Sequence, residues 1–543
     1  MLEAIGRVCF MPLVMTRLCV AIFVKDLAQA KRDIALAAEA GADMVELRLD
    51  YYAQPQSEEA SAPDRLQPLK QLIAESTLPC ILTCRPEYEG GYCVLSEEDR
   101  IQYLRSAADS AAAYVDLELQ AARCIGDVLA TPRHNRPGLI VSTHDFRGRP
   151  DRLYNLIDEL NSSPADIVKI VWTARTLRDN LEAFEILKTR QKPTIALCMG
   201  EAGLISRILA RKFGAFLTFA SPSTSTGTAP GQISVTEMKN LYRWDAIGAK
   251  TKVYGVVAQP VMHSMSPAIH NAAFEATDYD GVYLPLLVEA SYESFKAFME
   301  TFVNLEGLDL SGLSVTIPHK QNALRYLQSI GAEIEPLAQS IGAINTIVID
   351  RSEGSSPKLR GRNTDYAAIL DSITAKLNIT RQDLAKYRVA VLGAGGTGRT
   401  AVAALAHYGA DVVVYNRTLE HAEELAREFN GRTGTVRAAS MDQACRTDCS
   451  ILINTTSVGM HPKVDQSPLG EKPPCLTRDL LVFDCVYNPM KTKLLAQAEG
   501  AGAQTISGVE MFVRQAVTQF EAWTSQPAPV AIMRQVIERR LSQ

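Results

Sequence analysis

The chain has 543 residues, of which 47% are hydrophobic and 22% charged, and its formal net charge is −5. This length is too great for one hydrophobic core, so two or more domains are expected. No Lys/Arg-rich run appears, which excludes the electrostatic pattern of a nucleic-acid-binding protein. The apolar start is broken by Pro12 and Arg17 and has no cleavage site, so we expect no membrane span and no secretory or transit signal. A cytoplasmic protein with free thiols at its 11 cysteines and no metal site is therefore expected.

The first part of the chain repeats one pattern eight times. Short apolar, β-branched runs alternate with segments of helical spacing, and they occupy residues 19–23, 44–50, 79–84, 113–119, 138–144, 166–172, 193–199 and 215–220. Runs that are apolar throughout are typical of parallel strands covered on both faces. Eight such units predict an α/β fold of the (β/α)8 barrel type, with an open doubly wound sheet as the alternative.

Two side chains at neighbouring barrel strands are candidates for chemistry. Lys169 lies inside an apolar run, so its ammonium must be paired or must lose its proton easily, and a lysine of the second kind is an imine-forming nucleophile. The alternative is an ammonium held by a barrel carboxylate such as Glu46 or Glu118. His144 ends the preceding strand and can move protons for the same substrate, with Glu89 orienting the imidazole. Charge for a carboxylate ligand would come from Arg48, Arg85 and Arg207.

Six segments of this half resemble one family in order. They are ELRLD at 46–50, RPEYEGG at 85–91, VSTHDF at 141–146, VKIV at 168–171, MGEAGLISR at 199–207 and TAPGQ at 228–232. Together they resemble type I 3-dehydroquinate dehydratase over roughly residues 18–240. The resemblance implies that Lys169 forms an imine with 3-dehydroquinate and that His144 is the general base and acid. It implies substrate contacts from Glu46, Arg48, Arg85, Arg207, Thr228 and Gln232. Thr228 departs from the family, where we expect a serine that also carries a hydroxyl.

The pattern begins again with a strand at 252–258, and no long linker precedes it. Residues 388–418 read as strand, glycine-rich turn, helix and strand, which is a mononucleotide-binding unit. The expected bounds are 1–17 for an extension, 18–243 for the barrel, 244–251 for a linker, 252–365 for a substrate-binding lobe, 366–520 for a Rossmann-type NADP-binding lobe, and 521–543 for a C-terminal helix that returns to the substrate lobe.

The turn GAGGTG at 393–398 fits the dinucleotide pattern G-x-G-x-x-G. A structural turn is the alternative, but the flanking strand and helix favour a site for pyrophosphate at the helix N-terminus. The second strand ends without an acidic residue and carries Arg417 instead, which favours NADP(H) over NAD(H). The predicted cofactor-binding residues are Gly393, Ala394, Gly395, Gly396, Gly398, Asn416, Arg417, Thr418, Thr455 and Gly508.

Around this unit lie HSMSPAIHN (263–271), SVTIPHK (314–320), GAINT (342–346), RNTD (362–365), NTTSVGM (454–460), FDCVYNP (483–489) and GVEMFVRQA (508–516). Together they resemble shikimate dehydrogenase across residues 252–543. The resemblance implies that Lys320 and Asp365 form the catalytic pair. It implies substrate contacts from Ser264, Ser266, Thr316, Asn345, Tyr487 and Gln515. Ser314 stands where many bacterial members have asparagine, and it is common in the fused plant-type enzyme, whose domain order the chain also shares.

The two resemblances imply one bifunctional shikimate-pathway enzyme. It would convert 3-dehydroquinate to 3-dehydroshikimate and reduce that product to shikimate with NADPH. Two alternatives stay open: a quinate dehydrogenase in the second half, and a non-catalytic quinate-pathway sensor. A sensor should have lost reactive residues, whereas Lys169, His144, Lys320 and Asp365 are all present.

Overall fold

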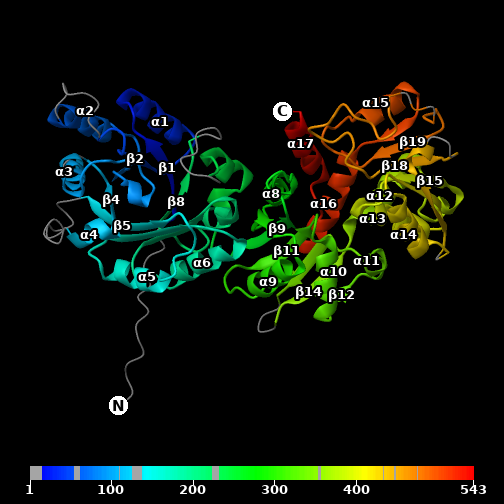
Figure 1. The fold of residues 1–543 in the computed structure, drawn as a ribbon, viewed down its shortest axis with the longest axis horizontal. Coiled ribbons are helices and arrows are strands. Elements are labelled where there is room, and N and C mark those ends of the chain that lie inside the picture. Colours follow the sequence, from blue (N-terminus) through cyan, green and yellow to red (C-terminus); the bar gives the residue numbers. More distant parts are fainter. Residues whose placement is uncertain are drawn as a thin grey trace, which may run out of the picture. The chain divides into compact units, whose positions relative to one another are not determined.

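The computed structural model describes residues 15–53, 62–108, 111–124, 137–222, 232–351, 356–431, 433–444, 448–471, 473 and 475–542. The chain divides into two compact units, Met1–Thr251 and Lys252–Gln543, and each is described here by itself (Figure 1).

The first unit is built on one sheet of eight parallel strands. These are β1 (Arg17–Phe23), β2 (Met44–Arg48), β3 (Cys80–Thr83), β4 (Tyr114–Glu118), β5 (Gly138–Asp145), β6 (Ile167–Thr173), β7 (Thr194–Met199) and β8 (Leu217–Ala220). Strands β1 to β7 are neighbours in chain order, and β8 pairs with β1. The Phe216 N–H donates to the Thr194 carbonyl at 2.8 Å, which brings the start of β8 to β7. This order confirms the predicted barrel. It excludes the doubly wound alternative, in which the order of the parallel strands reverses within the sheet.

Helices connect the strands of this barrel. They are α1 (Leu27–Glu39), α2 (Ala62–Ala74), α3 (Glu97–Ala108), α4 (Leu119–Cys124), α5 (Leu153–Ser162), α6 (Asn180–Lys188) and α7 (Leu204–Ile208). Shorter turns lie at Glu87–Glu89, Leu177–Asp179, Glu201–Gly203, Glu237–Leu241 and Trp244–Ala246. The residues that end the unit pack on it, because Trp244 is buried and Lys212 Nζ donates to the carbonyls of Ala249 and Thr251.

The second unit begins with a mixed six-stranded sheet in the order β10-β9-β11-β13-β14-β12. Its strands are β9 (Lys252–Ala258), β10 (Gly281–Leu287), β11 (Leu310–Val315), β12 (Glu333–Ile334), β13 (Thr346–Asp350) and β14 (Lys358–Arg362). Its helices are α8 (Ser266–Ala276), α9 (Tyr292–Phe302), α10 (Lys320–Ser329) and α11 (Pro336–Ile341). Helix α12 (Thr364–Leu377) leads to the next sheet, and the Asn363 side chain caps its first turn by accepting from the Asp365 and Tyr366 amides.

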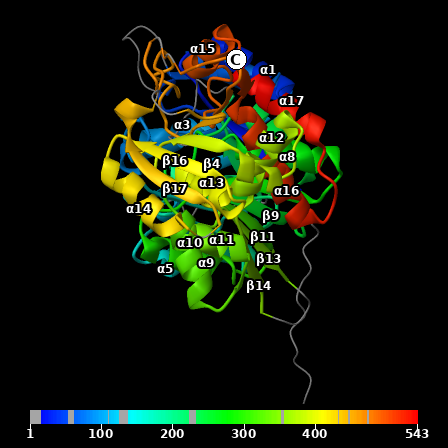
Figure 2. The same ribbon diagram turned by 90° about the vertical axis from the view of Figure 1, so that its right-hand side faces the viewer.

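The second sheet of this unit is wholly parallel, in the order β17-β16-β15-β18-β19-β20. Its strands are β15 (Arg388–Leu392), β16 (Asp411–Asn416), β17 (Thr435–Ser440), β18 (Ile451–Asn454), β19 (Leu481–Asp484) and β20 (Gln504–Ile506). Its helices are α13 (Gly396–His407), α14 (Leu419–Phe429) and α15 (Lys493–Gly500), with turns at Gln382–Lys386 and Met441–Gln443. Figure 2 shows α13 and α14 against β16 and β17. This is the Rossmann order, in which the strand sequence reverses beside β15 and a ligand site is expected there.

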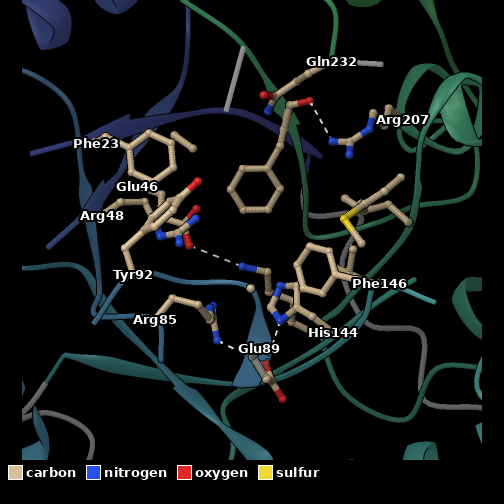
Figure 3. Close-up of a pocket in the computed structure, with 17 residues that line it drawn as sticks. Phe23, Glu46, Arg48, Arg85, Glu89, Tyr92, His144, Phe146, Arg207 and Gln232 are labelled. Atoms are coloured by element: carbon tan, nitrogen blue, oxygen red, sulfur yellow. Dashed lines mark hydrogen bonds and ion pairs between the residues drawn. The ribbon is translucent and has the colours of Figure 1, made fainter. Parts of the chain in front are cut away.

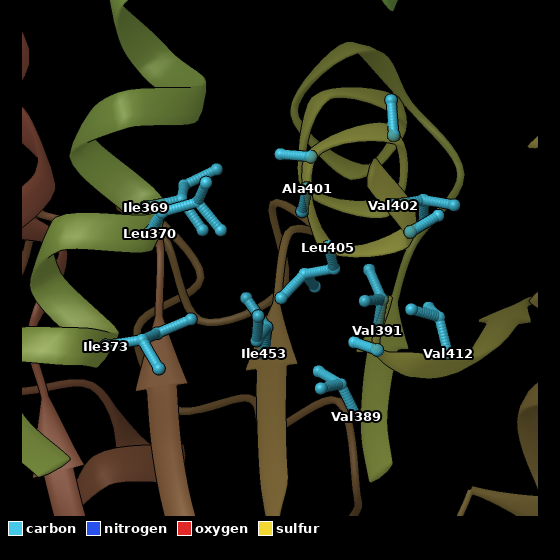
Figure 4. Close-up of a cluster of buried hydrophobic side chains, with 14 of the residues drawn as sticks. Ile369, Leu370, Ile373, Val389, Val391, Ala401, Val402, Leu405, Val412 and Ile453 are labelled. Carbon is cyan, nitrogen blue, oxygen red and sulfur yellow. The ribbon is translucent and has the colours of Figure 1, made fainter. Parts of the chain in front are cut away.

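Buried aliphatic side chains hold α12 and α13 on this sheet (Figure 4). Helix α16 (Gly508–Thr524) returns to the first sheet, where its Val513 and Phe520 join a core with Tyr254 of β9. Helix α17 (Val530–Leu541) then packs on α8. Helix α16, which follows the second sheet in the chain, therefore packs on the first sheet.

Among the described helices, none is long and apolar enough to cross a membrane. The expectation of free thiols is wrong at one position, because Cys475 is disulfide-bonded. Free thiols are found at Cys19, Cys80, Cys84, Cys93, Cys198, Cys449 and Cys485.

Candidate active sites

A pocket opens at the carboxyl ends of the barrel strands (Figure 3). It encloses about 690 Å³ of space outside protein atoms, open solvent at the mouth included. Its polar lining consists of Glu46, Arg48, Arg85, Glu89, Tyr92, His144, Lys169, Arg207 and Gln232. The predicted barrel residues thus lie around one cavity, except Thr228, which is outside the described residues.

Lys169 projects into the barrel because it lies on the same strand face as Ile167 and Val171, which belong to the interior apolar cluster. Its Nζ lies 2.8 Å from Asp116 Oδ2 and 3.3 Å from Glu46 Oε1. The ammonium is therefore held by two carboxylates, one of which is the Glu46 named in the alternative interpretation. This pairing fixes the amine at one point of the pocket wall.

Asp116 joins the lysine to a buried polar network. It accepts from Arg85 Nη2 at 2.9 Å and from Ser142 Oγ at 2.6 Å. Burial acts to raise the pKa of Asp116, but the charges of Arg85 and Lys169 outweigh it, and the pKa lies well below its usual value. Asp116 therefore stays ionised. Glu118 instead binds Arg85 Nη1 at 2.6 Å.

His144 and Glu89 form a second buried pair. His144 Nδ1 lies 2.9 Å from Glu89 Oε2. Burial, helped by the positive charges of Arg85 and Lys169, holds the pKa of His144 well below its usual value. Burial also raises the pKa of Glu89 to about 8, although Arg85 acts to lower it. The lowered pKa of His144 favours a neutral imidazole. In the tautomer whose Nδ1–H donates to Glu89, Nε2 can accept a proton.

Arg207 has no acidic partner among the residues that the structure describes. Its side chain is buried, its Nε has no hydrogen bond, and its Nη1 reaches only the Phe219 carbonyl at 3.5 Å. Burial lowers the pKa of Arg207 to about 10, which is still far above neutral. A buried guanidinium without a carboxylate calls for an anionic ligand.

The glycine-rich turn of the second unit lies between β15 and α13, at the reversal of strand order. A Cβ at Gly398 would stand 2.1 Å from the Gly393 carbonyl oxygen, so the helix can approach the strand only without a side chain there. At Gly395 and Gly396 a Cβ would meet nothing within 4 Å. Bare backbone at the start of α13 therefore faces open space, as a pyrophosphate site requires.

Other predicted cofactor residues gather at this turn. Asn416 Oδ1 accepts from the Ala394 amide at 3.2 Å, and Thr455 Oγ1 donates to the carbonyls of Leu392 and Gly393. Arg417 and Thr418 are exposed at the end of β16. Gly508 lies elsewhere, packed against the Cys485 and Val486 backbone at the start of α16.

Lys320 and Asp365 meet between the first residue of α10 and the first turn of α12. Lys320 Nζ lies 2.5 Å from Asp365 Oδ2. Near them Asn345 is fully engaged, since its Oδ1 accepts from the Thr364 amide at 2.8 Å and its Nδ2 donates to Thr364 Oγ1 at 3.0 Å. The pair is partly exposed and can exchange a proton with a ligand.

Other predicted substrate residues of this unit have the following contacts. The Ser266 amide donates to Ser264 Oγ at 3.2 Å, and the Thr316 carbonyl accepts from the His319 amide. Tyr487 stacks on Phe512 with 4.9 Å between ring centroids, and Gln515 Nε2 donates to the Phe512 carbonyl. The Ser266 side chain also hydrogen-bonds the Tyr283 side chain.

Comparisons with known proteins match both units of the chain. A family model described as type I 3-dehydroquinase matches residues 18–249. A bifunctional 3-dehydroquinate dehydratase/shikimate dehydrogenase of Arabidopsis thaliana, named as chloroplastic, is 38% identical over 536 residues, covering 96% of this chain and 84% of that protein. The chain belongs to this bifunctional family.

The family's second half is matched in three parts. The models described as shikimate dehydrogenase substrate binding domain, shikimate/quinate 5-dehydrogenase and shikimate 5′-dehydrogenase C-terminal domain match residues 256–347, 375–487 and 508–538. A shikimate dehydrogenase (NADP(+)) of Bacillus cereus is 36% identical over 293 residues, 53% of this chain and 99% of that protein. A solved structure named dehydroquinate dehydratase and shikimate dehydrogenase from S. pombe AroM is 26% identical, covers 96% of this chain and 98% of that chain, and has a TM-score of 0.43.

Two residues near these sites did not stand out in the sequence. Asp116 and Glu118 are two residues apart and so lie on the same face of strand β4. Two acidic residues at this spacing in an apolar strand are the sequence pattern that could have indicated Asp116. Gln519 lies one helical turn beyond Gln515, and it accepts from Ser314 Oγ at 2.8 Å and donates to Thr346 Oγ1 at 2.9 Å. Ser314 in turn accepts from the Tyr283 hydroxyl, so its hydroxyl is bound within the protein.

Proposed function

We propose that the barrel dehydrates 3-dehydroquinate to 3-dehydroshikimate and that the second unit reduces 3-dehydroshikimate to shikimate with NADPH. One observation carries the proposal: Lys169 and His144 face a single pocket that also contains Arg207, a buried cation to which the described residues offer no acidic partner. A ketone that carries a carboxylate fits this combination. Family membership supports the same two reactions.

In the barrel reaction, Lys169 first gives a proton to a neighbouring base, and its neutral amine attacks the substrate ketone to form an imine with loss of water. The imine makes the adjacent carbon–hydrogen bond acidic, so His144 can take that proton and return it to the departing hydroxyl. Hydrolysis of the imine after the elimination releases the product and restores the amine. Glu89 holds the ring by Nδ1 and leaves Nε2 for this transfer. Arg207 binds the carboxylate and so fixes which carbon faces His144.

Replacement of His144 by Ala should separate the two steps. The imine should still form, because Lys169 and Asp116 are unchanged, but turnover should fall roughly 10²–10⁴-fold without the proton carrier. Borohydride trapping followed by mass spectrometry measures the imine, and a coupled assay measures turnover. An H144A enzyme that neither traps nor turns over while staying folded would contradict this division of roles.

In the second unit, the turn at Gly395 and Gly396 would hold the cofactor pyrophosphate, and Arg417 would bind a 2′-phosphate. NADPH, when bound, supplies the hydride for the ketone. Lys320 then gives a proton to the oxygen that becomes a hydroxyl, while Asp365 orients the ammonium.

Replacement of Arg417 by Ala should change cofactor preference. A guanidinium–phosphate contact contributes about 1.5–3 kcal/mol, so KM for NADP⁺ should rise about 10- to 100-fold while KM for NAD⁺ changes little. Arg427→Ala is the matched control, because Arg427 is also exposed and, within the described part of the chain, donates to the Glu423 carbonyl of its own helix. Equal effects of R417A on both cofactors would contradict the assignment.

One assay series tests the whole proposal. Purified protein with 3-dehydroquinate should give 3-dehydroshikimate, and added NADPH should carry the product to shikimate. Parallel reactions with quinate and with NAD⁺ measure specificity. Absence of both activities in folded protein would refute the proposal.

We also propose a cytoplasmic location, as the composition leads us to expect. The Arabidopsis relative is named as chloroplastic, so cell fractionation is the test. Recovery of the protein with an organelle marker would overturn this part of the proposal.

A further inference from the structure

Asp50 accepts hydrogen bonds from three other residues. It lies at the edge of the barrel site and is not among the residues that line the pocket. Its carboxylate is fully buried. Oδ1 accepts from Arg48 Nε at 3.2 Å, and Oδ2 accepts from Arg48 Nη2 at 2.6 Å. The Arg85 amide donates to Oδ1 at 2.9 Å and the Tyr92 amide donates to Oδ2 at 3.2 Å. One carboxylate thus binds a side chain on β2 and two backbone groups after β3.

The two backbone donors are the two ends of one segment. Residues 85–92 leave β3, turn through Glu87–Glu89 and two glycines, and return to the start. A Cβ at Gly91 would stand 2.0 Å from the Arg85 carbonyl oxygen, so the ends approach closely. Glycine-rich backbone loses much conformational entropy when it is fixed in one conformation. Asp50 stabilises this conformation by binding both ends of the segment.

This segment carries much of the proposed catalytic apparatus. Arg85, Glu89 and Tyr92 all line the pocket, and Glu89 holds the His144 ring. A displacement of the segment would move the Glu89 carboxyl away from the imidazole. Misplacement of a catalytic group by about 1 Å can cost about 10²-fold in rate.

The same carboxylate orients Arg48. Two parallel bonds use its Nε and Nη2, and the guanidinium stacks over the Phe23 ring at 4.9 Å. A bidentate pair of this kind fixes the plane of the arginine. Arg48 lines the pocket, where it can bind a ligand oxygen.

We propose that Asp50 is a positioning residue of the dehydratase site, which acts through Arg48 and through the segment 85–92. The inference rests on the proposed function of the barrel. In this role Asp50 fixes the position of the ligand-binding Arg48 relative to the Glu89–His144 pair. Asp50 itself need not touch the substrate.

The test is Asp50→Asn, which keeps the size but places an NH₂ group opposite one of the N–H donors. The kcat/KM for 3-dehydroquinate should fall by about 10²-fold, and shikimate dehydrogenase activity of the same protein should be unchanged. Asp43→Asn is the matched control, because Asp43 accepts a backbone N–H from Leu18 at 2.7 Å at the opposite end of the strands. The control should keep full activity.

A double variant distinguishes positioning from a purely structural role. Because Asp50 acts in part through Arg48, the loss in Asp50→Asn/Arg48→Ala should be clearly smaller than the product of the two single losses. If D50N does not fold, Arg48→Lys takes its place, since an ammonium cannot form the bidentate contact and should lower kcat/KM similarly.

Each outcome decides one point. Wild-type protein without dehydratase activity would overturn the proposed function and this inference with it. Active wild type with unchanged D50N, with losses that multiply in the double variant, or with an unchanged R48K where D50N is unfolded, would overturn the inference alone.

Discussion

Replacement of Lys169 by Ala should abolish the dehydratase activity, with a loss of about 10⁴-fold or more, because no other group in the pocket can form the imine. The shikimate dehydrogenase activity of the same chain should be unchanged. In the wild-type protein, borohydride added with 3-dehydroquinate should leave one stable adduct, and peptide mass spectrometry should place it on Lys169.

Two further variants serve as controls for this result. Lys169→Arg keeps a cation beside Asp116 and Glu46 but cannot form an imine, so it separates lost chemistry from an unpaired buried carboxylate. Lys192→Ala removes a lysine of the same barrel that donates only to the Ser163 carbonyl, and its activity should be normal. An adduct on a different lysine, or an active K169R enzyme, would sink the assignment.

Lys320→Ala and Asp365→Asn should each lower kcat of the dehydrogenase roughly 10²–10⁴-fold, because the developing alkoxide loses its proton donor. KM for shikimate should change less, since the loss falls on the transition state. The double variant should be little worse than either single one, because the two groups act as a unit. Dehydratase activity should be unchanged in all three proteins.

Asp371→Asn is the control for this pair. It breaks another ion pair of helix α12, in which Arg381 Nη2 lies 2.6 Å from Asp371 Oδ1, and kcat should be normal. If K320A and D365N keep near-normal kcat but melt at lower temperature, the pair is a structural tie between α10 and α12. Another proton donor would then have to be identified.

The order of helices and strands could be predicted from local sequence, because each strand has a recognisable apolar pattern of its own. A run such as residues 166–172 is apolar at nearly every position, and this pattern follows from burial on both faces. The same local logic predicts the turn after β15, where glycine is needed for a close helix–strand approach at Gly398. Short-range patterns of this kind also carry the motifs that imply Lys169, His144, Lys320 and Asp365.

Partners across strands were not accessible in the same way. Lys169 and Asp116 are 53 residues apart, and the sequence named Glu46 and Glu118 as candidate partners. Glu46 is confirmed as a partner at 3.3 Å, whereas Asp116 was not named. Strand register alone does not decide between Glu118 and Asp116, since Ser142 is paired with Glu118 on one side and with Lys169 on the other. In the folded barrel Glu118 binds Arg85 and Arg100, whereas Asp116 binds both Arg85 and Lys169.

By itself, the sequence determined the barrel, the two-lobed second unit, the family resemblance and the reactive side chains, because strand burial, glycine turns and short motifs are local properties. Only the tertiary structure decided which carboxylates hold Lys169, that no described residue gives Arg207 an acidic partner, and that Asp50 joins Arg48 to the segment 85–92. The physical reason is that charges are paired by distance in the fold, and strand register and chain closure set those distances between residues far apart in sequence.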